Sequence, residues 1–67
     1  MVMVENNIRE RMKREGMSMR YVADRVGMSY QQMYNIIDGK MDCKLSTALK
    51  IAYLFDDIVE NIFSVEV

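Results

Sequence analysis

Amide and tyrosine side chains are concentrated in one short segment of the sequence. Between Ser29 and Ile37 there is no carboxylate, and the segment carries two tyrosines and three amides, namely Tyr30, Gln31, Gln32, Tyr34 and Asn35. Glutamine and asparagine donate and accept hydrogen bonds together, which matches the edge that adenine presents in the major groove. A solvated helix face favours Glu and Lys instead, so the pattern favours contact with base pairs.

The composition excludes several other kinds of chemistry. The chain has a single cysteine, Cys43, and no histidine, which excludes an internal disulfide, a zinc site and Cys-His catalysis. It also lacks a glycine-rich phosphate loop and clustered acids. We therefore expect no enzymatic activity, no metal and no cofactor, and a free, reduced thiol at Cys43.

Three glycines mark the ends of the helices that must position the segment. Gly16, Gly27 and Gly39 are almost evenly spaced, as expected for C-terminal caps in a helical chain without proline. Together with capping residues and apolar periodicity they predict five helices, over residues 8–15, 19–26, 30–37, 45–55 and 58–62. The predicted N-terminal caps are Ser18, Ser29, Asn7 in a capping box with Glu10, and Asp57 in a capping box with Glu60.

Helical spacing also indicates which side chains are buried. In the segment 30–37 the inward side chains are Met33, Ile36 and Ile37. The fourth helix has a wide apolar face that is typical of a central helix, made of Leu45, Ala48, Leu49, Ile51, Ala52 and Leu54.

The two ends of the chain differ from its helical middle. Residues 2–4 and 63–67 are rich in β-formers, and pairing them in a short antiparallel sheet is the economical arrangement. The predicted fold is mainly α, a five-helix bundle with a two-stranded sheet from the N- and C-termini. The 67 residues are expected to form one domain, residues 1–67.

Charge is distributed unevenly along the sequence. Residues 1–44 carry a net charge of +2 and residues 45–67 a net charge of −3, for a total of −1. The front half can therefore face a polyanion although the whole chain is acidic, and the alternative that charge alone leaves open is an ordinary surface of mixed charge. Apolar runs are too short for a membrane span, and no basic, apolar leader opens the sequence, so we expect a cytoplasmic protein without membrane contact.

The helices predicted at 19–26 and 30–37 are separated by a turn of about three residues. The first contains a small residue, Ala23, that permits a close helix crossing. This is the helix-turn-helix arrangement, in which the first helix crosses the DNA backbone and the second enters the major groove.

On these residues the chain resembles the Cro and phage-repressor-type family of helix-turn-helix regulators, over residues 7–63. The matching strings are Gly16-Met17-Ser18, Val22-Ala23-Asp24-Arg25-Val26-Gly27-Met28-Ser29, Ile36-Ile37-Asp38-Gly39-Lys40, and Leu45-Ser46-Thr47-Ala48-Leu49-Lys50-Ile51-Ala52 with Ile62-Phe63. The resemblance implies a lambda-repressor-like bundle. The strand-forming ends resemble those of small dimeric members with a terminal sheet.

The resemblance also implies roles for individual residues. Base contacts are expected from Tyr30, Gln31, Gln32 and Asn35, and DNA backbone contacts from Met19, Arg20, Ser29, Tyr34, Lys40 and Lys44. The chain departs from the family at three places. Met19 replaces a phosphate-contacting glutamine, with Arg20 as its substitute. Met12 and Ile37 replace an ion pair, and Cys43-Lys44 replaces Pro-Ser.

Function and partners follow as expectations. The chain is expected to be a sequence-specific transcription regulator of double-stranded DNA, a repressor, bound as a homodimer to a palindromic operator. The subunit contact is expected on the acidic rear of the molecule, formed by the fifth helix, the end of the fourth helix and the terminal strands, at Phe55, Val59, Phe63 and Val65. No small-molecule effector is evident. The alternative is a protein-binding regulator, an antitoxin or anti-repressor, that keeps the fold without binding DNA.

Overall fold

Five helices and two strands make up the computed structural model, which describes residues 3–66. Their order is β1 (Met3–Asn6), α1 (Ile8–Glu15), α2 (Met19–Val26), α3 (Tyr30–Ile37), α4 (Leu45–Leu54), α5 (Val59–Ile62) and β2 (Phe63–Glu66). Each predicted element is present, and the helical boundaries differ by at most one residue. The first strand lies further along the chain than expected, and Val2 and Val67, predicted in strands, lie outside the described residues.

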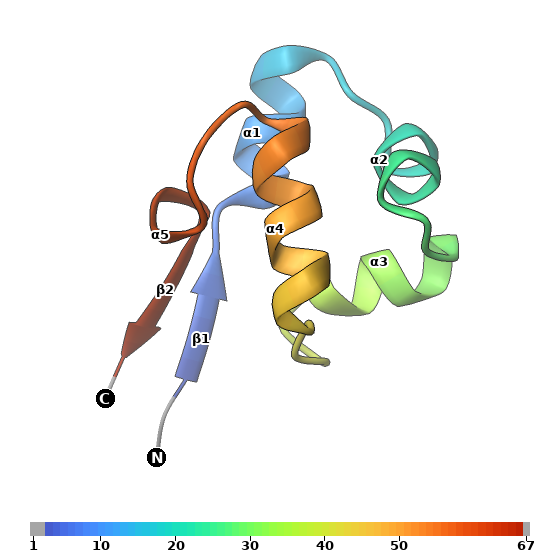
Figure 1. Cartoon of the computed structure of the whole chain (residues 1–67). Coiled ribbons are helices and arrows are strands. Elements are labelled where there is room, and N and C mark those ends of the chain that lie inside the picture. The colour runs from blue at the N-terminus through green and yellow to red at the C-terminus, as the bar shows by residue number, and fades with distance from the viewer. Residues whose placement is uncertain (1–2, 67) are drawn as a thin grey trace.

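The strands bring the two ends of the chain together. β1 and β2 pair antiparallel, with Val4 opposite Val65 and Asn6 opposite Phe63, on the side of α4 that is remote from α2 (Figure 1). The mainly helical fold with a terminal two-stranded sheet is therefore confirmed. Within residues 3–66 no helix has the length and apolar character to cross a membrane.

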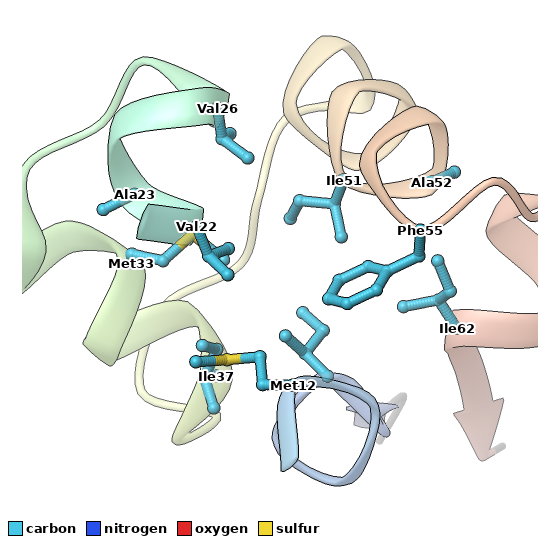
Figure 2. Packing of buried hydrophobic residues seen from close by; sticks show 11 residues of the cluster. Met12, Val22, Ala23, Val26, Met33, Ile37, Ile51, Ala52, Phe55 and Ile62 are labelled. Atoms are coloured by element: carbon cyan, nitrogen blue, oxygen red, sulfur yellow. The ribbon is translucent and has the colours of Figure 1, made fainter. Parts of the chain in front are cut away.

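A single cluster of buried apolar side chains joins the helices. Its fully buried members are Ile8, Met33, Ile51 and Val22, which come from four different helices. Met12 and Ile37 also belong to this cluster (Figure 2), and each is only 8% exposed. The expected replacement of an ion pair by an apolar contact fits these positions, since a buried ion pair loses much of its attraction to desolvation.

α4 buries a narrower face than predicted. Ala48, Ile51 and Ala52 are buried, but the side chains of Leu45 and Leu49 are 72% and 53% exposed. The prediction of a wide buried face was wrong at these two positions. The small side chains of Ala48 and Ala52 allow close packing on one side of α4. The adjacent side, which carries Leu45 and Leu49, stays exposed to solvent.

Phe55 also lies differently from the expectation of a subunit contact. Its ring points into the core near Ile51 and Ile62 (Figure 2) and is only 7% exposed. The turn after α4, in which Asp56 takes a left-handed conformation (φ +53°), returns the chain so that Ile62 joins the same cluster. Phe55 thus stabilises the monomer and offers no contact surface.

Two of the four predicted N-terminal caps are confirmed. The hydroxyl of Ser18 accepts a hydrogen bond from the Tyr21 amide, and Ser29 forms a full capping box with Gln32. The side chain of Asn7 does not cap α1, and α5 begins after Ile58, so the boxes with Glu10 and Glu60 were wrong. Gly16 and Gly27 end their helices in the left-handed conformation, at φ +69° and +82°.

Asn7 and Asp57 instead belong to a polar network around Arg11. The guanidinium of Arg11 lies 2.8 Å from a carboxylate oxygen of Asp57, donates to the side-chain oxygen of Asn7 (2.8 Å) and donates to the carbonyl of Asn61 (3.0 Å). Asp57 also accepts from the Asn61 side chain and the Ile58 amide. The network ties α1 to the start of α5.

We expect this network to make folding stability depend on pH. Hydrogen bonds from Asn61, the Ile58 amide and Arg11 hold the pKa of Asp57 below its ordinary value. A lowered pKa stabilises the fold at neutral pH, and this contribution disappears as the pH falls through the lowered value. Asp57→Asn should therefore lower the thermal midpoint at pH 7, with a difference from wild type that shrinks below about pH 4.

The matched control is Asp56→Asn, which removes a neighbouring exposed carboxylate. Asparagine tolerates the left-handed conformation of this position, so little change in midpoint is expected. A difference between Asp57→Asn and wild type that stays constant from neutral to acidic pH would contradict the role assigned to the charge.

Candidate nucleic-acid interface

The turn between α2 and α3 is fixed by local hydrogen bonds and by one buried contact. The amides of Gly27 and Met28 both donate to the carbonyl of Ala23 (2.9 Å each), and Met28 packs against the core. Ser29 follows directly and is the N-terminal cap of α3. α3 runs from below α2 toward the N-terminal end of α4 (Figure 1), with Met33 and Ile36 buried. Its opposite side is left to solvent.

The side chains predicted to read bases lie on the outward side of α3 or at its border. Tyr30, Gln31 and Gln32 are exposed, and Asn35 is half-buried. The amide nitrogen of Gln31 donates to the side-chain oxygen of Asn35 at 3.0 Å. This pairing leaves the oxygen of Gln31 as an acceptor and the nitrogen of Asn35 as a donor, the combination that complements adenine.

Gln32, predicted only to contact a base, also has a structural role. Its side-chain oxygen accepts from the Ser29 amide at 3.2 Å, while the Gln32 amide donates to the Ser29 hydroxyl at 3.1 Å. Because the box occupies the oxygen of Gln32, its amide nitrogen remains as a donor toward DNA.

The predicted backbone contacts divide into two groups. Arg20, Ser29, Lys40 and Lys44 are exposed, whereas Met19 packs against the core. The ammonium of Lys40 lies 3.5 Å from Asp38 and 5.8 Å from the centre of the half-buried Tyr34 ring. Arg9 also approaches Asp38, at 3.7 Å. The acid nearest the end of α3 is thus paired with two cations.

One positioning residue, Asn6, was missed in the sequence. At the end of β1, its amide nitrogen donates to the carbonyls of Ile36 (3.2 Å) and Ile37 (3.5 Å) at the C-terminal end of α3. Its oxygen accepts from the Ile8 amide at 3.1 Å. Asn6 therefore connects the sheet, α1 and α3. The sequence near Asn6 does not indicate this role, because its partners on α3 lie 30 and 31 residues away.

These features define a class of protein. Two short helices joined by a tight turn, with an amide-rich and acid-free outer face on the second, form a helix-turn-helix DNA-binding domain. The family model of the Cro/C1-type HTH DNA-binding domain matches residues 7–66, and the chain belongs to this family.

The solved structures agree on the fold. A proposed DNA-binding protein from Bacteroides fragilis, known from a crystal structure, superposes with a TM-score of 0.82 at 19% sequence identity. The match covers 92% of this chain and 100% of that chain. No curated protein sequence matches this chain.

We expect Asn6→Asp to show how strongly β1 holds α3. The substitution keeps an acceptor for the Ile8 amide but replaces the donor to Ile36 by a carboxylate oxygen that repels the carbonyl. The free energy of unfolding should fall by about 1–3 kcal/mol, measured by denaturant titration. Hydrogen exchange should quicken at the end of α3, where the amide of Gly39 donates to the carbonyl of Ile36.

Asn7→Asp is the matched control for this measurement. It makes the same chemical change one residue along and keeps the acceptor that Arg11 uses. Equal acceleration of exchange at Gly39 in both variants would show that Asn6 has no special influence on α3.

Proposed function

We propose that this protein is a sequence-specific transcription regulator that inserts α3 into the major groove of double-stranded DNA. The observation that carries the proposal is the exposed outer face of α3, which has amides and tyrosines and no carboxylate. Membership in the Cro/C1-type family supports DNA as the partner. Binding to an operator would block polymerase, which makes repression the simplest outcome.

Direct readout would come from the first two turns of α3. Gln31 and Asn35 would act as one unit, since their mutual hydrogen bond presents an acceptor and a donor together. Tyr30, at the start of the helix, would add an apolar contact, and Gln32 would donate through its free nitrogen. A bidentate amide contact discriminates between bases by about 1–3 kcal/mol.

Contacts with phosphates would position α3 without specifying sequence. Ser29, Arg20, Lys40 and Lys44 are exposed donors around the helix-turn-helix unit. Tyr34 would contribute through its hydroxyl group beside Lys40. Met19 would contribute packing beneath Arg20, because its side chain lies against the core.

A homodimer on a palindromic operator would multiply these contacts. One α3 offers only four base-contacting side chains. Two copies about one helical turn apart would read two half-sites at once. The alternative function, a protein-binding antitoxin or anti-repressor, is favoured by the net charge of −1 and by exposed tyrosines such as Tyr53, which is 89% exposed.

Gln31→Ala should weaken specific DNA binding by about 1–3 kcal/mol and relax preference at one base pair of each half-site. Operators selected from random duplexes and then titrated by fluorescence anisotropy would provide both values. Ser46→Ala, an exposed polar change on α4, is the control and should leave affinity unchanged. Base preference identical to wild type in Gln31→Ala would contradict the role given to this residue.

Salt dependence separates the two functions. DNA binding should weaken steeply with added salt through counterion release. Lys44→Ala should reduce the slope of log affinity against log salt by about 1 for each subunit, or about 2 for the bound dimer. Lys13→Ala is the matched control, because Lys13 is an exposed lysine on α1, outside the helix-turn-helix unit, and is expected to keep the slope. Absence of any salt-dependent duplex binding by the wild type would favour the protein-binding alternative.

A further inference from the structure

A stripe of large apolar side chains on α4 has no partner in the monomer. Leu45, Leu49 and Tyr53 are 72%, 53% and 89% exposed, and their four-residue spacing places them in one row along the helix. We call Leu45, Leu49 and Tyr53 the α4 stripe. Contiguous apolar surface of this kind marks interaction sites on soluble domains.

A groove between α2 and α4 extends the α4 stripe sideways. Its lining includes Leu49, Tyr53 and Tyr21, which is 45% exposed and has the guanidinium of Arg25 5.8 Å from the centre of its ring. Asp24, Arg25 and Lys50 also line the groove. The surface therefore joins an apolar centre to charges of both signs, as a self-complementary contact requires.

The rear of the molecule is a poorer surface for a symmetric contact. Glu5, Asp56 and Glu60 are exposed there, so two copies would bring like charges together. Of the side chains predicted for this contact, Phe55 is buried and Val59 and Phe63 are partly buried against the core. Of these predicted side chains, only Val65 is largely exposed, at 58%, and it lies opposite Val4, which is 45% exposed.

We propose that a second copy of this chain covers the α4 stripe, with Leu49 near the two-fold axis and the two α4 helices roughly parallel. An aromatic side chain carries roughly 150–250 Å² of surface. At these exposures, complete burial of the α4 stripe and Tyr21 in two copies would remove on the order of 1,000 Å² from solvent, the lower limit for a specific interface.

The orientation of the helices rests on the proposed function. α3 lies at the N-terminal end of α4 (Figure 1), close in sequence to Lys40 and Lys44. Parallel α4 helices would place both copies of α3 on the same side of the dimer, where one DNA duplex could meet both. Antiparallel helices would place the copies of α3 on opposite sides.

Leu49→Glu should weaken self-association at least about tenfold in sedimentation, because the two-fold axis sets two added carboxylates against each other. Leu49 is half exposed, so the thermal midpoint should stay close to that of wild type. Val65→Glu, at a position of similar exposure on the rear, is the matched control and should keep the dimer. Loss of the dimer in Val65→Glu with its retention in Leu49→Glu would overturn the proposal, and so would a wild type that stays monomeric at high micromolar concentration.

A disulfide across the proposed two-fold axis tests the same contact, and its formation needs no DNA. In a Cys43→Ser background, Leu49→Cys should form a covalent dimer under mild oxidation, whereas Val65→Cys should not. The oxidised Leu49→Cys dimer should then bind one palindromic duplex per dimer. Binding of two separate duplexes would overturn the parallel orientation. If the covalent dimer forms but neither it nor the wild type binds a duplex, the DNA-binding function is overturned while the α4 contact stands.

Discussion

The burial of Met33, Ile36 and Ile37 determines which side of α3 is available for recognition. These side chains are at most 8% exposed, and Met33 is fully enclosed. On a helix of eight residues, fixing one face in the core also fixes the opposite face toward solvent. The outward direction of Gln31 therefore follows from an apolar contact on the other side of the same helix.

Such a small core leaves α3 in need of polar support. Asn6 donates to the carbonyls at the end of α3, and the capping box of Ser29 and Gln32 satisfies its beginning. Both ends of the helix are thus held by side chains, which limits fraying where the backbone lacks internal partners. The terminal sheet has a purpose in this arrangement, because it holds Asn6 in place.

The fold was predictable from sequence where the deciding interactions are local. Ser18, Ser29 and Gly27 act within a few residues of themselves, and their roles were predicted correctly. Asn7 and Asp57 carry the same cap signal, but both interact with the charged guanidinium of Arg11, which lies four residues along the chain from Asn7 and across the fold from Asp57. The contacts of Asn6 and the exposure of Leu49 depend on which helices meet, and sequence periodicity holds no information about that.

The net acidity of the chain does not oppose contact with a polyanion, because of where its acidic side chains lie. Asp38, the acid closest to α3, lies between Arg9 and Lys40, and Asp57 is paired with Arg11. Glu5, Asp56 and Glu60 are exposed on β1, in the turn after α4 and on α5, outside the helix-turn-helix unit. Charges separated by more than about 10 Å are largely screened at moderate salt. A phosphate near α3 would therefore respond to its neighbouring cations rather than to the total charge of the chain.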